Sequence, residues 1–177
     1  MGGDRHPVDA VMLARRAASF TRRSIKSDSK QSGLRLAISM LDLTTLEGAD
    51  SPELVRALCQ RAIHPCPVSL DMPVPPVAAV CVYPKLVPVV RESLLGTGVL
   101  TASVATSFPS GQSPLDARLA ETEAAIAAGA DEIDMVISRG AFLSGRFDEV
   151  AAEVRAVQDI CGQTHLKVIL ETGELAT

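Results

Sequence analysis

The chain has 177 residues, of which 47% are apolar and 21% are charged. A chain of this length is expected to form one domain, because domains usually hold about 100 to 200 residues. No apolar run approaches the roughly 18 to 20 residues that a membrane-spanning helix needs. The composition therefore predicts a soluble protein without membrane association.

The formal net charge of −4 is unevenly distributed. Residues 1–33 carry seven Lys/Arg and three Asp/Glu, whereas residues 34–177 carry ten and eighteen. With four Phe, one Tyr and no Trp, the acidic part offers neither a phosphate-neutralising surface nor a stacking platform for bases. We therefore exclude nucleic acid as a partner of this part of the chain.

The cysteines and histidines show no metal-binding spacing. Four Cys and three His are present, without a CxxC pair or a zinc-type arrangement. No secretory signal precedes the cysteines, so they are interpreted as reduced thiols of a cytoplasmic protein. No metal site and no cofactor are predicted from these residues.

Residues 1–33 are interpreted as a basic helix followed by a linker. Apolar residues from Val8 to Phe20 recur at helical spacing, and the Ser/Lys-rich stretch Ser24–Ser32 is typical of a linker. The helix either packs on the domain or belongs to a mitochondrial-type targeting segment. Asp4, Asp9 and Asp28 count against targeting, because targeting segments are poor in acidic residues.

From Leu34 onward, short β-rich runs alternate with helical runs. The predicted helices begin near Ser51, Lys85, Pro114 and Asp148. The predicted strands are nearly continuous apolar runs, as expected for strands covered on both faces. They are Leu36–Leu43, Val77–Tyr83, Thr101–Thr106, Glu132–Ile137 and Leu166–Leu170.

This alternation predicts a parallel α/β sheet, either a doubly wound open sheet or a (βα)8 barrel. A dinucleotide fingerprint is rejected, because Gly96-Thr97-Gly98 lacks the third glycine and follows a helix. Polar residues recur at or near the carboxyl ends of the predicted strands, where both folds place their chemistry. We therefore expect the functional site there.

Asp134 and Lys167 are unusual because each lies in an apolar strand. A buried charge is normally paired or functional. One interpretation is a structural ion pair between the two. The other is a lysine that forms a Schiff base with an aldehyde while the carboxylate moves protons.

The Schiff-base interpretation requires a second cation. A lysine amine has a reference pKa of about 10.4 and must lose its proton to attack a carbonyl. A nearby Asp134 would oppose this, because a negative charge favours the ammonium. Lys85 is expected to face solvent, so the sequence supplies no obvious candidate for that cation.

Five sequence blocks in order, from about residue 36 to the last residue, resemble the deoxyribose-phosphate aldolase family. The resemblance implies a (βα)8 barrel and cofactor-free cleavage of 2-deoxy-D-ribose 5-phosphate to acetaldehyde and D-glyceraldehyde 3-phosphate. The blocks are Asp42-Leu43-Thr44-Thr45-Leu46, Ala79–Pro84, Ala102–Gly111, Gly129–Ile137 and Leu166–Leu175.

The same resemblance implies roles for individual residues. Lys167 would be the Schiff-base lysine and Asp134 the carboxylate that relays protons. The remaining residues implied to line the substrate pocket are Asp42, Thr44, Cys81 and Thr172.

The chain departs from the family in length. Five strands are recognised where a barrel has eight, and the family's later Lys-Thr-Ser-Thr-Gly segment is not found. We therefore expect residues 34–177 to form a TIM-barrel-type domain truncated after about five strands and inactive alone. Such a sheet exposes edges, which predicts a homo-oligomer or pairing with a full-length subunit. Two alternatives remain, namely a non-catalytic partner of a full-length aldolase and an unrelated α/β binding domain.

Overall fold

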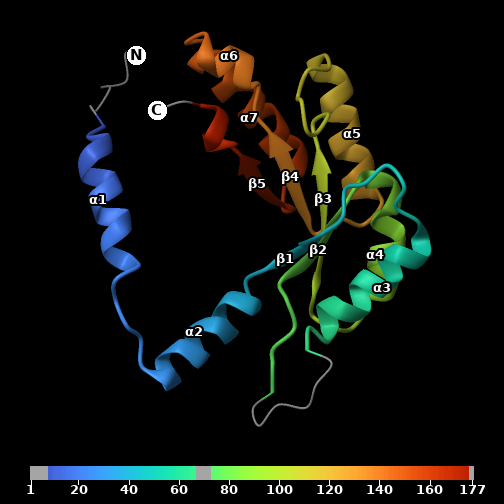
Figure 1. Ribbon diagram of the computed structural model, residues 1–177. Helices are drawn as coiled ribbons and strands as arrows, with labels where there is room; N and C mark the ends of the chain where they lie inside the picture. Colours follow the sequence, from blue (N-terminus) through green and yellow to red (C-terminus); the bar gives the residue numbers. More distant parts are fainter. Residues whose placement is uncertain (1–7, 67–72, 176–177) are drawn as a thin grey trace. The chain divides into compact units, whose positions relative to one another are not determined.

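The structure, a computed structural model, describes residues 8–66 and 73–175 (Figure 1). The chain divides after Leu34 into an N-terminal unit and a sheet domain. Within the described ranges, no helix is both long and apolar enough to cross a membrane. The elements are α1 (Ala10–Phe20), α2 (Ser27–Ile38), β1 (Asp42–Thr44), α3 (Pro52–Ile63), β2 (Ala79–Val82), η1 (Pro84–Leu86), α4 (Val87–Ser93), β3 (Leu100–Ala105), α5 (Leu115–Ala127), β4 (Glu132–Val136), α6 (Arg139–Leu143), α7 (Phe147–Cys161), β5 (His165–Ile169) and η2 (Thr172–Glu174).

The helix predicted near the N-terminus forms as α1. Its N-cap is Asp9, whose side chain accepts a hydrogen bond from the backbone N–H of Met12 at 2.9 Å. Such a cap satisfies an amide that has no partner within the helix. The apolar side chains of Val11, Met12 and Phe20 are exposed.

Two boundaries predicted between the helix and the sheet are wrong. The expected linker Ser24–Ser32 is helical from Ser27 onward, and α2 continues through the first residues of the expected strand Leu36–Leu43. Asp28 in the first turn and Arg35 in the last complement the helix dipole, which favours this helix. The first strand is therefore only three residues long and begins at Asp42.

The five strands are parallel and follow the order β1-β2-β3-β4-β5. Strands that are consecutive in the chain are therefore neighbours in the sheet, as in a (βα)8 barrel. A doubly wound sheet would reverse its strand order at a switch point. The predicted barrel-type fold is confirmed over these five strands.

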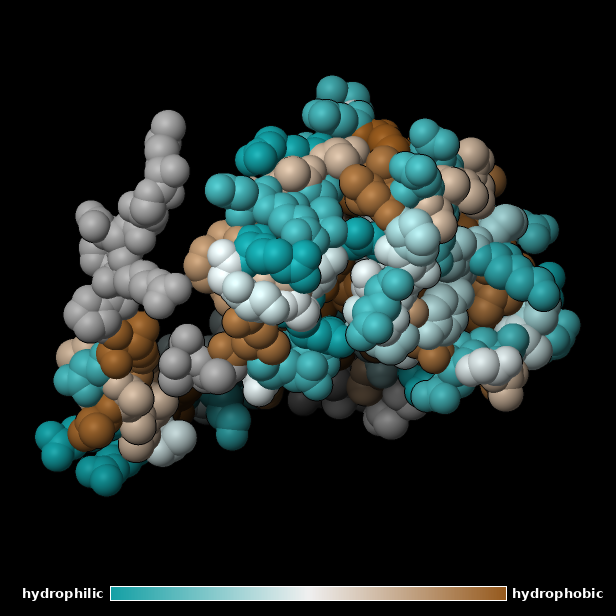
Figure 2. Space-filling view, turned by 90° about the horizontal axis from the view of Figure 1, so that it is seen from above, coloured by the Kyte–Doolittle hydropathy of each residue, from teal (hydrophilic) through white to brown (hydrophobic). Residues whose placement is uncertain are grey.

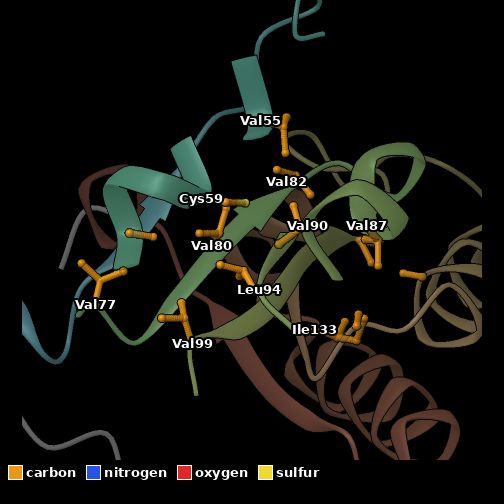
Figure 3. Close-up of a cluster of buried hydrophobic side chains, with 14 of the residues drawn as sticks. Val55, Cys59, Val77, Val80, Val82, Val87, Val90, Leu94, Val99 and Ile133 are labelled. Atoms are coloured by element: carbon orange, nitrogen blue, oxygen red, sulfur yellow. The ribbon is translucent and has the colours of Figure 1, made fainter. Parts of the chain in front are cut away.

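Helices cover the outer face of the sheet. Ser51 caps α3 by accepting a hydrogen bond from the N–H of Leu54, and Pro52 follows at the first helical position, as predicted. Figure 3 shows side chains of α3, α4 and β2 packed in one buried cluster. Burying each side chain of this size contributes about 1.5–3 kcal/mol. The labelled members from these elements are Val55, Cys59, Val80, Val82, Val87 and Val90.

The inner face of the sheet carries smaller residues. Ala79, Cys81, Ala102 and Val104 are buried there, and Leu46, Tyr83 and Phe108 pack against them. The rings of Tyr83 and Phe108 meet edge to face with centroids 6.3 Å apart. Seen from above, the sheet domain presents hydrophilic residues interspersed with scattered apolar ones (Figure 2).

Candidate active site

Lys167 lies at the centre of an acidic cluster on the inner face. It stands opposite Asp134 in the register of β4 and β5. Its Nζ is 3.2 Å from Asp134 Oδ1 and 3.1 Å from Glu132 Oε2, and it also donates to Asp42 Oδ2. An ammonium has three N–H donors, and each has a different carboxylate within reach. We call Asp42, Glu132, Asp134 and Lys167 the inner-face cluster.

The contact between Lys167 and Asp42 requires a curved sheet. Asp42 lies on β1 and Lys167 on β5, the two outermost strands. Neighbouring strands are about 4.8 Å apart, so a flat sheet would separate these two strands by about 19 Å. That is beyond the reach of a lysine and an aspartate side chain. The ion pair therefore shows that the inner face is concave.

Cys81 contacts the second oxygen of the Asp134 carboxylate. Its thiol donates to Asp134 Oδ2 at an Sγ–O distance of 3.7 Å. Burial, reinforced by the negative charge of Asp134, raises the pKa of Cys81 to about 12. The thiol therefore stays protonated near neutral pH and acts as a weak donor. Reactive cysteines have a lowered pKa instead, so the Cys81 thiol is not activated as a nucleophile.

The electrostatic environment keeps Lys167 protonated. Burial alone would lower the pKa of Lys167, but the hydrogen bonds to Asp42 and Glu132 and the charge of Asp134 raise it above its ordinary value. Burial raises the pKa of Asp134, although Lys167 opposes this change. The pKa of Lys167 is therefore raised, as the sequence predicts for a lysine beside Asp134.

The inner-face cluster surrounds its ammonium with carboxylates. The charged groups that act on Lys167 are Asp42, Glu132 and Asp134, all of which are acidic. Lys85 is exposed in η1, as expected. Among the described residues, no group of three or more His, Cys, Asp or Glu side chains is placed to hold a metal ion. The Nζ atom occupies the position between the carboxylates.

Thr44 and Thr172 lie outside the contacts of the inner-face cluster. Thr44 is exposed at the end of β1, and Thr172 is exposed in η2 after β5. Beside Thr172, Arg139 pairs with Glu171 and, at 3.3 Å, with Glu174. The cluster itself lies within the strands rather than beyond their ends. The cluster therefore lies further from the carboxyl ends of the strands than the sequence pattern predicted.

Glu132 is the member of the inner-face cluster that the sequence analysis missed. It precedes Asp134 by two positions in β4, so both side chains point to the same face. The alternation of strand faces was the signal that could have identified it.

A pocket of about 210 Å³ lies away from this cluster, near the amino end of β3. Arg91 and Asp131 line it and pair with each other at 2.8 Å. Parallel α/β folds bind their ligands at the opposite, carboxyl ends of the strands. The inner-face cluster is the better candidate for a functional site, because it gathers charged side chains from three strands on one face.

The loop after β3 is held against the end of β4. Thr106 Oγ1 accepts from the N–H of Val136 at 2.9 Å and donates to its carbonyl at 3.2 Å. Thr106 and Ser107 both have a positive φ, near +61° and +60°. Such conformations require support from surrounding contacts, and they cluster near functional sites. The loop thereby places Phe108 beside the inner face.

We expect Gly111→Ala to destabilise the protein by about 1–3 kcal/mol, since the residue has a left-handed backbone. Its φ is +68°, and an added Cβ would lie 3.2 Å from Val136 Cγ2 and 3.3 Å from the Ile137 carbonyl oxygen. Urea unfolding followed by circular dichroism would measure the change. Gly140→Ala is the matched control, because nothing lies within 4 Å of its added Cβ. Equal stability of the two variants would contradict this account of the loop.

Comparisons of sequence place the chain among aldolases. Residues 36–177 match the DeoC/LacD family aldolase profile. The chain is 39% identical to mouse deoxyribose-phosphate aldolase over 176 residues, covering 95% of this chain and 55% of the mouse protein. It is 38% identical to the human deoxyribose-phosphate aldolase, covering 97% of this chain and 56% of that protein. The chain thus spans about half the length of the curated relatives it matches.

Solved structures show the same fold. A protein of Coccidioides immitis assigned as a deoxyribose-phosphate aldolase superposes with a TM-score of 0.70 at 28% identity, over 80% of this chain and 52% of that chain. The tetrameric deoxyribose phosphate aldolase of Aeropyrum pernix superposes with a TM-score of 0.61 at 26% identity, over 78% and 54%. With the matching profile, the ordered parallel strands and the inner-face cluster, the chain belongs to the DeoC/LacD family of aldolases.

Proposed function

We propose that residues 34–177 carry the carboxylate-rich side of an aldolase active site for 2-deoxy-D-ribose 5-phosphate. The inner-face cluster is the observation that carries this proposal, because it gathers charged groups from β1, β4 and β5 on a concave face. Family membership and the names of the mouse and human relatives support the substrate. The expected products are acetaldehyde and D-glyceraldehyde 3-phosphate.

The reaction needs a primary amine and a group that moves protons. The amine attacks the aldehyde carbon of the open-chain sugar, and loss of water leaves an iminium ion. A base then removes the proton of the C3 hydroxyl, and the C2–C3 bond breaks with its electron pair passing into an enamine. Protonation of the enamine at C2 and hydrolysis release acetaldehyde and the amine. We assign the proton-moving role to Asp134, whose two oxygens face Lys167 and Cys81.

We propose that Lys167 supplies this amine, as the family resemblance implies. Its Nζ rests among three carboxylates, which raise the pKa of Lys167 above its ordinary value. The ammonium must therefore pass a proton to one of these carboxylates before the amine attacks the aldehyde. Because this environment favours the ammonium, the 177-residue chain should have little aldolase activity alone.

Reductive trapping tests this role of Lys167. The chain is incubated with acetaldehyde and sodium borohydride near neutral pH, and N-ethylation is mapped by peptide mass spectrometry. We expect more label at Lys167 than at Lys85, an exposed lysine that reports non-specific reaction, and loss of the Lys167 label in Lys167→Met. Labelling of Lys167 no greater than that of Lys85 would refute the imine-forming role.

We also propose that the protein self-associates or pairs with a longer aldolase subunit. In the part of the chain that the structure describes, β1 pairs with β2 alone and β5 with β4 alone. Each therefore presents one edge of unpaired backbone groups, which favours association. The tetrameric relative from Aeropyrum pernix shows that assembly occurs among similar proteins.

A further inference from the structure

The helix α1 exposes an apolar stripe along its length. At about 3.6 residues per turn, its apolar residues other than Met12 fall on one half of the helix surface. None of the residues of α1 is buried, and the side chains of Val11, Leu13 and Phe20 are 63%, 48% and 56% exposed. An isolated helix of this length is only marginally stable in water, so a surface that buries the stripe would stabilise it. The members of this α1 stripe are Ala10, Val11, Leu13, Ala14, Ala17, Ala18 and Phe20.

The charges around the α1 stripe are all positive. Residues 10–26 include five Lys/Arg and no Asp/Glu. The helical period places Arg15 beside one border of the stripe and Arg16 beside the other. The guanidinium of Arg23 lies over the ring of Phe20, 5.2 Å from its centroid. The helix therefore combines an apolar face with cationic flanks.

A partner of α1 has to bury apolar side chains and neutralise cations at the same time. A nucleic acid would neutralise the arginines but would leave the aliphatic side chains in water. A lipid surface with anionic headgroups does both, because an amphipathic helix sinks its apolar face to the level of the acyl chains while its arginines reach up to the headgroups. Arginines on both borders suit a flat surface, where headgroups lie on both sides of the helix.

We propose that α1 lies in the plane of an anionic lipid surface and holds the protein there. Among the described residues, no helix could cross a bilayer. A helix that lies on the surface is a different case, because it needs neither that length nor apolar residues on every side. One short helix with five nearby cations gives reversible binding that depends on salt. This inference does not depend on the proposed aldolase reaction.

Co-sedimentation of the full chain with lipid vesicles tests the proposal. One set of vesicles contains about one-third phosphatidylserine in phosphatidylcholine, and the other contains phosphatidylcholine alone. We expect the chain to bind the anionic vesicles at least about tenfold more strongly, because each basic residue is attracted to the negative surface. Raising NaCl from about 0.05 M to about 0.5 M should remove most of this preference, because salt screens the attraction.

Two glutamine variants separate burial of the α1 stripe from the effect of charge. Leu13→Gln removes an apolar side chain from the stripe, whereas Met12→Gln is the matched control on the opposite side of the helix. Both variants keep the net charge, and Gln resembles Leu and Met in helix propensity. We expect Leu13→Gln to weaken binding to the anionic vesicles about tenfold and Met12→Gln less than about twofold, because only the stripe enters the lipid.

Equal binding by the two variants would overturn the proposal, as would an unsubstituted chain that does not bind the anionic vesicles. Two other occupants of the α1 stripe would be recognised in the lipid-free protein. If the stripe packs on the sheet domain, Leu13→Gln should lower the urea midpoint. If it joins two copies of the chain, Leu13→Gln should lower the sedimentation coefficient. Either change, in a chain that does not bind vesicles, would assign the stripe to that occupant instead.

Discussion

Arg118→Met is expected to destabilise the protein by about 3–5 kcal/mol, because it strands a buried charge. Arg118 of α5 pairs with Glu153 of α7 at 2.6 Å, with side chains only 5% and 10% exposed. Arg118 also donates to Ser138 Oγ at 3.2 Å, just beyond β4. The variant would leave Glu153 without its cation and release the end of that strand. Urea unfolding near neutral pH measures the loss.

The acidity of Glu153 gives this prediction a pH dependence. Burial raises its pKa, but hydrogen bonds from Arg118 and Ser138 prevail and lower it below the ordinary 4.5. A lowered pKa stabilises the fold above about pH 4.5, and this contribution is lost as the pH falls through the folded-state value. In Arg118→Met, the buried Glu153 carboxyl group has lost its cation, so its neutral, protonated form is the more stable one. The difference in the free energy of unfolding between the unsubstituted protein and Arg118→Met should therefore become smaller at acidic pH.

A double variant separates the charge effect from packing. Arg118→Met combined with Glu153→Met removes both members of the pair, so no buried charge remains unpaired. We expect it to recover most of the lost stability, since apolar replacements of buried pairs are often neutral or better. A double variant as unstable as Arg118→Met would show that the charge is not the cause. A loss below about 1 kcal/mol in the single variant would also contradict the prediction.

The second large effect is expected for Lys167→Met, at about 2–4 kcal/mol near neutral pH. The variant leaves three carboxylates facing one another without a cation. Lys167 retains partial contact with water, so the expected loss is smaller than for a fully buried pair. Lys85→Met is the control, because it removes an exposed lysine and should change stability by less than about 0.5 kcal/mol.

The free energies of unfolding of the unsubstituted protein and of Lys167→Met should converge at both extremes of pH. The raised pKa of Lys167 means that its ammonium stabilises the fold fully below the ordinary value of 10.5, and that this contribution is lost as the pH rises from there through the higher folded-state value. In acid, protonation of the stranded carboxylates should rescue Lys167→Met. Urea midpoints measured at about pH 5 and about pH 7 would test this. A deficit that does not change between them would exclude carboxylate repulsion as its source.

The alternation of strands and helices could be predicted from local sequence, because each strand is an apolar run with a helix after it. The order of the strands in the sheet was implied only by the family resemblance. Ser51-Pro52 marked the start of α3 correctly, since capping depends on neighbouring residues alone. The expected strand Leu36–Leu43 failed because its first apolar residues continue α2. An apolar run of that length suits either a helix or a strand, and the preceding serine-rich residues concealed the helix start.

The candidate site was predicted in part. Asp134 and Lys167 stood out as charges within apolar strands, and their opposition across β4 and β5 follows from the register. Neither the contact of Lys167 with Asp42 nor the pairing of Arg118 with Glu153 could be read from spacing. The first depends on the curvature of the sheet, and the second on how α5 packs against α7. Both are products of tertiary geometry.

The ion pair between the outermost strands also bears on the order of folding. Lys167 and Asp42 are 125 positions apart in the chain. Contacts of such long range form only after the intervening segments have been organised, because closing so large a loop earlier would cost entropy without return. We therefore expect the pair to form late in folding, so that its loss in Lys167→Met mainly speeds unfolding, which stopped-flow kinetics in urea would measure.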